Sequence, residues 1–146
     1  MACPPAALQL IESFERFRRL PYDDGYGYMT VGWGHVIRPG EDWSRGITRY
    51  QADALLERDL AKAERAVALL LPIPLNDNQR GAMISFTFNA GAGALQRSTF
   101  RQCMLRGDFG DVPAGMMLYC KAGRPLRISA GLQRRRAAEV KLFQAG

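Results

Sequence analysis

Residues 22–35 read Tyr-Asp-Asp-Gly-Tyr-Gly-Tyr-Met-Thr-Val-Gly-Trp-Gly-His, with an Asp-Gly pair between short aromatic and β-branched runs. This pattern is typical of a β-hairpin. In the second strand, bulky side chains alternate with small ones, so we expect one bulky face and one nearly bare face. The bulky residues are Met29, Val31, Trp33 and His35, and the small ones are Thr30, Gly32 and Gly34. A bare face would let a bulky polymer approach the backbone.

A helix is predicted before this hairpin. Apolar residues from Ala7 to Phe17 recur at intervals of three and four, which is the helical period. We expect the helix to run to about Arg18 or Arg19 and to be ended by Pro21. Glu15 would then lie near its C-terminal end, beside the apolar face. Partial desolvation and the negative end of the helix dipole would both favour its neutral form, as a general acid requires.

Helical patterns dominate the chain after a loop at 38–46. Thr48 and Gln51 have the spacing of a capping box and begin a long helix over about 49–71, which a Pro-rich segment at 71–74 ends. Asn76 and Gln79 begin another helix, whose part from 83 to 89 is apolar on nearly all sides and should be the buried centre of a helical lobe. Shorter helices are expected after Ser98 and Asp111, and a last one over about 132–143.

The bulk composition fits a single globular domain with an anionic partner. Twenty Lys and Arg against fourteen Asp and Glu give a charge of +6, which suits nucleic acid, anionic lipid or the bacterial cell wall. Cys3, Cys103 and Cys120 form no C-x-x-C pair, and His35 is the single histidine, so we expect free thiols, no metal site and no cofactor. Neither a signal peptide nor a transmembrane run is recognisable, which predicts a cytoplasmic protein unless something else releases it.

Two carboxylates are candidates for acid–base chemistry. Glu15 lies beside an apolar helix face, and Asp24 lies in a polar, glycine-rich turn where water and backbone amides would keep it ionised. Different environments for two carboxylates are typical of glycoside cleavage. From these residues alone the alternatives stay open, because Glu15 could pair with Arg18 or Arg19 on a solvated face, and Asp-Gly turns are common without catalysis.

The spacing of these residues resembles the active-site segment of phage-type lysozymes, glycoside hydrolase family 24. Glu15 is followed after eight residues by Asp24 and after five more by Thr30, and then by Val-Gly-Trp-Gly-His. Four further motifs occur in the family's order: Leu-Ile-x-x-Phe-Glu at 10–15, Phe-x-Phe-Asn-x-Gly at 86–91, Ser-Thr-Phe at 98–100 and Gly-Leu-x-Arg-Arg-Arg-Ala-Ala-Glu at 131–139. The resemblance covers about residues 8 to 143. Trp33 replaces the family's usual Tyr, and residues 120–129 fit the pattern less cleanly.

The resemblance implies a mainly helical α+β, lysozyme-like fold in one domain of residues 1–146. A small α/β lobe over about 15–50, containing the hairpin, would be joined by the long helix at about 49–71 to a larger helical lobe. That larger lobe would comprise about 72–146 and the N-terminal helix, with the cleft between the two lobes.

The same resemblance implies roles for individual residues. Glu15 would protonate the glycosidic oxygen, Asp24 would act from the other face, and Thr30 would hold the attacking water. The residues expected to contact the glycan are Val36, Phe88, Asn89 and Arg135. The alternatives are a place in the core for Val36 and Phe88 and a helix C-cap for Asn89, whereas His35 is expected to be a structural hydrogen-bonding residue.

The activity implied is that of a monomeric endolysin that cleaves the β-1,4 bond between N-acetylmuramic acid and N-acetylglucosamine in peptidoglycan, with inversion. It would wait in the host cytoplasm for a holin pore, with no nucleic-acid partner and with a possible peripheral contact to the anionic envelope. Two other classes remain as alternatives. One is a non-catalytic binder of anionic polymer acting through Arg134, Arg135 and Arg136, and the other is a nucleic-acid-binding helical domain, which would leave the hairpin unexplained.

Overall fold

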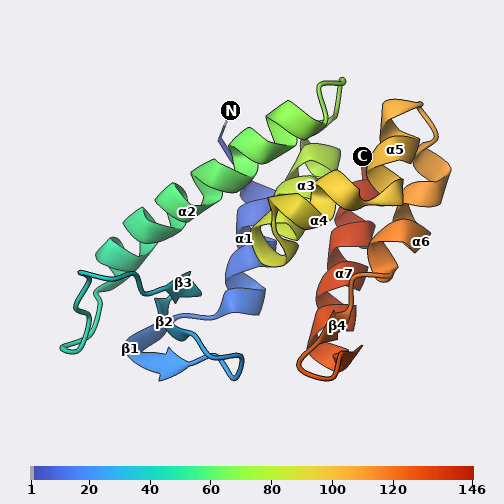
Figure 1. The fold of residues 1–146 in the computed structure, drawn as a ribbon. Coiled ribbons are helices and arrows are strands. Elements are labelled where there is room, and N and C mark those ends of the chain that lie inside the picture. Colours follow the sequence, from blue (N-terminus) through green and yellow to red (C-terminus); the bar gives the residue numbers. More distant parts are fainter. Residues whose placement is uncertain (1) are drawn as a thin grey trace.

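A computed structural model describes residues 2–146 and places a small sheet and a group of helices at opposite ends of one long helix (Figure 1). The elements in chain order are α1 (Pro5–Glu15), β1 (Arg18–Asp23), β2 (Met29–Gly32), β3 (His35–Val36), α2 (Arg49–Leu70), α3 (Asp77–Ala90), α4 (Ala92–Arg97), α5 (Thr99–Leu105), the 3₁₀ turn η1 (Phe109–Asp111), α6 (Val112–Met117), β4 (Lys121–Ala122), β5 (Arg127–Ile128) and α7 (Ala130–Gln144). This is the mainly helical α+β, lysozyme-like fold that the resemblance implies.

The sheet confirms the hairpin and corrects its second strand. Strands β1, β2 and β3 pair antiparallel in that order, so the Asp-Gly turn does join two paired strands. A single strand over 29–35 is wrong, because the chain reverses after Gly32 and places His35 opposite Val31. Gly32 and Gly34 have φ of +67° and +74°, a region that favours glycine and permits the reversal. The bare face is also wrong, since Thr30 is buried along with Val31.

Helix α1 ends three to four residues before the predicted boundary. It stops at Glu15, and Arg16 follows in the left-handed region with φ of +56°. The turned chain brings Phe17 against Trp33, with ring centroids 5.6 Å apart. Pro21 therefore does not end a helix but lies inside β1, which is an edge strand where a missing N–H is tolerated.

Both predicted capping boxes are confirmed. The Thr48 hydroxyl accepts from the Gln51 N–H at 3.1 Å and the Asn76 side chain accepts from the Gln79 N–H at 2.7 Å. Each Gln side chain in turn accepts from the backbone N–H of its capping residue. These bonds satisfy N–H groups that have no partner within the helix, and so set where α2 and α3 begin.

Helix α3 is the centre of the helical lobe. Its residues 81–87 are all buried, and it packs against α1, α2 and α7. The burial ends earlier than expected, because Phe88 is half-buried and Asn89 is exposed. The last turn of α3 therefore opens onto the surface, which frees both side chains for contacts outside the core.

The remaining helices begin close to where the sequence predicts them, whereas several of the short elements between them were not predicted. Helices α5 and α6 follow Ser98 and Asp111 as expected, and α7 starts two residues early because the Ser129 hydroxyl accepts from the Leu132 N–H. Helix α4, the 3₁₀ turn and the short β4–β5 hairpin were not anticipated. Across residues 2–146, no helix is both long and apolar enough to span a membrane.

Candidate active site

Two neighbouring hollows lie between the sheet and the helical lobe. The smaller hollow, about 600 Å³, is bounded by residues of β3, α2, α3 and the turn after β1. The larger hollow, about 830 Å³, is bounded by the end of α1, by α4, by the β4–β5 hairpin and by α7. Glu15 and Asn89 line both hollows, so these two residues mark where the hollows meet.

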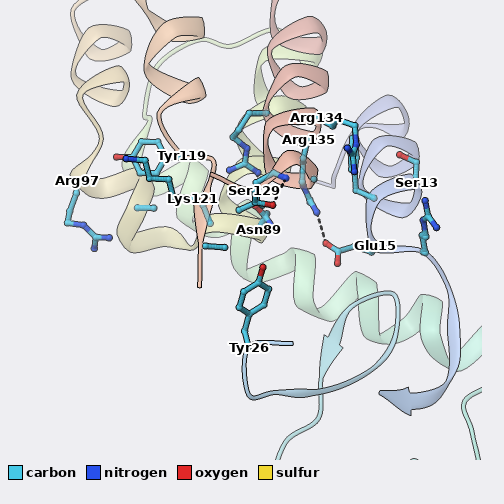
Figure 2. Close-up of a pocket in the computed structure, with 18 residues that line it drawn as sticks. Ser13, Glu15, Tyr26, Asn89, Arg97, Tyr119, Lys121, Ser129, Arg134 and Arg135 are labelled. Atoms are coloured by element: carbon cyan, nitrogen blue, oxygen red, sulfur yellow. Dashed lines mark hydrogen bonds and ion pairs between the residues drawn. The ribbon is translucent and has the colours of Figure 1, made fainter. Parts of the chain in front are cut away.

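Glu15 is held from the helical lobe by an arginine 120 residues away. The Arg135 Nη1 donates to the Glu15 Oε2 at 2.6 Å, and the Glu15 side chain is 19 % exposed (Figure 2). Burial of Glu15 is thus partial, as expected, and the ion pair with Arg135 fixes the orientation of its carboxylate. The carboxylate also lies directly against Gly34, where a Cβ would collide with the Glu15 side chain.

Asp24 is anchored within its own turn. One carboxylate oxygen accepts from the Tyr26 N–H at 2.7 Å and from the Tyr28 N–H at 3.1 Å. Thr30 is tied to the same residue, Tyr28, since its hydroxyl donates to the Tyr28 carbonyl at 3.4 Å. Asp24 lines the smaller hollow with Glu15, whereas Thr30 is only 3 % exposed and is absent from the lining of both hollows.

The expected glycan-contacting residues fall on the two hollows. Val36, Phe88 and Asn89 line the smaller hollow together with Glu15 and Asp24. Val36 is 45 % exposed, so it is not a core residue, and the C-cap of α3 is Gly91 and not Asn89. Arg135 lines the larger hollow, where Tyr26 reaches from the turn after β1 toward the helical lobe (Figure 2).

A buried carboxylate supports the site from below. Glu139, fully buried on α7, lies 3.4 Å from the Arg135 Nε and 2.7 Å from the Arg136 Nε, and it accepts from the Ser85 hydroxyl at 2.5 Å. Arg136 in turn donates to the Asn89 side chain at 2.7 Å. Burial raises the pKa of the Glu139 carboxyl, and the two guanidiniums and the Ser85 hydroxyl oppose that rise. Glu139 thereby positions the arginines that hold Glu15 and Asn89.

His35 is enclosed by two carboxylates, in agreement with the structural role expected of it. Its Nδ1 lies 2.7 Å from Asp59 on α2 and its Nε2 lies 3.0 Å from Glu41 in the following loop. Burial alone would raise the pKa of Glu41, but hydrogen bonds from His35 and the Arg38 N–H hold it below its ordinary value. These contacts join β3, whose residues line the smaller hollow, to α2 and to the loop that follows β3.

The arginine triplet of α7 does not form the exposed basic face that a non-catalytic binder would use. Arg136 is completely buried and Arg135 is 4 % exposed, so only Arg134 remains on the surface. The sequence signalled Arg135 through the family motif. It carried no signal for the bonds that Arg136 and Glu139 make, because those partners lie on other helices.

Comparison with known proteins agrees with this geometry. Residues 12–139 match the family model described as phage lysozyme. The chain is 33 % identical over 143 residues to an endolysin of Acyrthosiphon pisum secondary endosymbiont phage 1, covering 94 % of each chain. It spans about half the length of two other curated endolysins, at 53 % and 56 %.

Solved structures show the same fold over the whole chain. The muramidase domain of SpmX from Asticaccaulis excentricus superposes with a TM-score of 0.88 at 32 % identity, covering 99 % of this chain and 98 % of that one. A mutant of the P22 lysozyme superposes with a TM-score of 0.84 at 31 % identity, covering 99 % of both chains.

Proposed function

The chain belongs to the phage lysozyme family, and from that premise we propose that it hydrolyses the β-1,4 bond between N-acetylmuramic acid and N-acetylglucosamine in peptidoglycan. Peptidoglycan-degrading glycoside hydrolysis is the activity of this family. The observation that carries the finer proposal is that Glu15 and Asp24, on different elements, line one hollow. A pair of carboxylates across a cleft is what glycosidic cleavage requires.

In this proposal Glu15 is the general acid. As the bond from the anomeric carbon breaks, its proton passes to the leaving glycosidic oxygen, and Arg135 then stabilises the carboxylate that remains. The free enzyme must take up a proton on Glu15 before the next turnover. The ion pair with Arg135 fixes the orientation of the Glu15 carboxylate.

Asp24 is the proposed base. It would take a proton from water as that water attacks the anomeric carbon from the opposite face, which inverts the configuration. Two backbone N–H bonds hold the Asp24 carboxylate in place. Thr30, fixed through Tyr28 to the same turn, is proposed to hold this water, and Val36, Phe88 and Asn89 are proposed to contact the sugar rings.

Mass spectrometry of digested peptidoglycan tests the bond assignment. A muramidase releases fragments that end in a reducing N-acetylmuramic acid. A lytic transglycosylase adds no water to the cut bond and leaves an anhydro end, which is lighter by the mass of one water, about 18 mass units. An amidase would separate the glycan from the peptide. Reducing muramic ends are expected, and either of the other product sets would refute the proposal.

The stereochemistry is tested separately by NMR of the first product formed. Inversion of a β-linked substrate yields the α-anomer first, because water attacks the face opposite the leaving group. An initial β-anomer would exclude the proposed role of Asp24 and leave the bond assignment intact.

We propose further that the protein acts as a monomer, reaches the wall through a holin pore and touches the anionic envelope only peripherally. The support for release by a holin is the likeness to proteins named endolysins. Expression with and without a holin checks the route, since lysis should require the pore. Lysis at equal rates without it would overturn this part of the proposal.

A further inference from the structure

The larger hollow has a charge pattern that glycan cleavage does not explain. Four exposed cations line it, and each comes from a different part of the chain: Arg16 after α1, Arg97 at the end of α4, Lys121 on β4 and Arg134 on α7. Within residues 2–146 none of the four forms an ion pair. Four segments thus converge on one space with unbalanced positive charge.

No free carboxylate in the lining offsets this charge. Glu15 is the one acidic residue lining the larger hollow, and it is already paired with Arg135. The smaller hollow differs, because Glu15, Asp24 and Asp59 line it against Arg38 and Lys62. The sequence shows the same bias, since residues 112–138 contain six Lys and Arg and no Asp or Glu. The cleft is therefore polarised, with its basic end beyond Glu15.

The basic end adjoins the bond-cleaving residues. Glu15 and Asn89 belong to both hollows, so a group bound in the larger hollow lies beside the sugar on which Glu15 acts. Such a group is most simply a part of the same substrate molecule. In peptidoglycan the anionic substituent on the glycan is the peptide stem, whose carboxyl groups are free in some walls and amidated in others.

We propose that the larger hollow reads the charge of the peptide stem, binding stems with free carboxylates through Arg97, Lys121 and Arg134, with Arg16 adding to the field. This inference rests on the proposed glycosidic activity and deepens it to a preference among walls. The hollow of about 830 Å³ is large enough to take several linked residues, and Tyr26 and Tyr119 supply flat apolar surface within it. Charged hydrogen bonds to carboxylates are stronger than those to neutral amides, which gives the discrimination.

The test compares two substrates that differ only in stem charge. Sacculi are stripped of phosphate-bearing polymers with hydrofluoric acid, and one half is then amidated with carbodiimide and ammonia. The release of reducing ends is measured on both for the wild type and for the variant R97Q/K121Q/R134Q. The variant R58Q/R65Q/K141Q removes the same charge from exposed positions outside both hollows and serves as the control.

The wild type is expected to cleave the native wall about three- to tenfold faster than the amidated wall, since exposed ion pairs each contribute modestly. The hollow variant should lose this preference and the control should keep it. High salt should shrink the preference for the wild type. If the hollow variant cannot be purified folded, as judged by circular dichroism, the three single substitutions are compared in its place.

Two results would overturn the inference. One is equal wild-type rates on native and amidated walls after phosphate polymers are removed, which would leave a phosphate polymer as the ligand. The other is an equal loss by the hollow variant on both walls, which would indicate a contact to the glycan. Failure of the proposed function looks different, because no reducing ends would then be released from either wall.

Discussion

Glu15 donates the proton in the proposed mechanism, so replacing this one residue is the most direct test of that mechanism. Glu15→Gln keeps the shape of the side chain and a hydrogen bond acceptor for Arg135, but it removes the acid. Lysis of cell walls should fall on the order of 10²–10⁴-fold with the melting temperature little changed. Glu12→Gln, one turn earlier on α1, is the matched control and should lyse walls at the wild-type rate. Equal activity of the two variants would remove Glu15 from the mechanism.

Gly34 tests how tightly the Glu15 carboxylate is held. Its φ of +74° is strained for alanine, and a Cβ there would collide with the Glu15 side chain. We expect Gly34→Ala to lower kcat on the order of 10–100-fold, because small displacements of a catalytic group are costly.

Gly40→Ala separates backbone strain from the collision. Gly40 has a φ of +88° but open space where its Cβ would be placed. An alanine there would therefore introduce the backbone strain without a collision. Both variants should lose about 1 kcal/mol of stability in chemical unfolding, and only Gly34→Ala should lose activity. A similar loss of kcat in both would mean that the Glu15 contact is unimportant.

At the scale of an element, the loop between β3 and α2 depends on Glu41. Its pKa is lowered in the folded protein, so the contacts of the charged form stabilise the fold above the ordinary value of 4.5 and are lost as pH falls through the lowered pKa. Glu41→Gln should therefore be about 1–2 kcal/mol less stable than the wild type at pH 7, with the difference shrinking as pH falls below 4.5 and through the lowered pKa. Urea unfolding across this range measures it, with the exposed Glu57→Gln as control. A difference independent of pH would contradict the assignment.

The packing of α7 on α3 depends on Glu139 in the same way, but inside the core. Glu139→Gln leaves the buried Arg136 guanidinium without its counter-charge and leaves Arg135 with Glu15 alone, and breaking such a buried pair typically costs about 3–5 kcal/mol. Lysis should fall as well, since Arg135 loses the group that positions it against Glu15. Ser85→Ala removes only one hydrogen bond to Glu139 and should cost about 1 kcal/mol. Chemical unfolding of both variants measures these two losses of stability. A similar small loss of stability in each would show that Glu139 is uncharged or replaceable.

At the scale of the whole molecule, the two lobes hold together without covalent cross-links among the described residues. Cys3, Cys103 and Cys120 are all free, and burial with the nearby Glu64 raises the pKa of Cys3 to about 11. Thiols in that state are poor nucleophiles at neutral pH. We expect the variant C3A/C103A/C120A to lyse walls at close to the wild-type rate, with and without dithiothreitol. Inactivation of the wild type by the reductant would show that a disulfide matters.

Local chemistry accounts for the features that the sequence determined by itself. Both capping boxes, the Asp-Gly hairpin and the helical periods are set by residues within a few positions of one another, so their spacing alone was sufficient. The presence of Glu15 and Asp24 in one hollow was also predictable, because only the short strand β1 separates them and their spacing matches a family motif.

Only the tertiary structure decided the features that join distant parts of the chain. The positive φ at Arg16 ended α1 early, and the reversal at Gly32 and Gly34 split a predicted strand, because packing against α2 and the sheet overrode local periodicity. The Arg135 contact to Glu15 spans 120 residues, and the larger hollow collects cations from four separate segments of the chain. Such contacts depend on how the helices pack against one another. The order of residues along the chain does not say which distant residues packing will bring together.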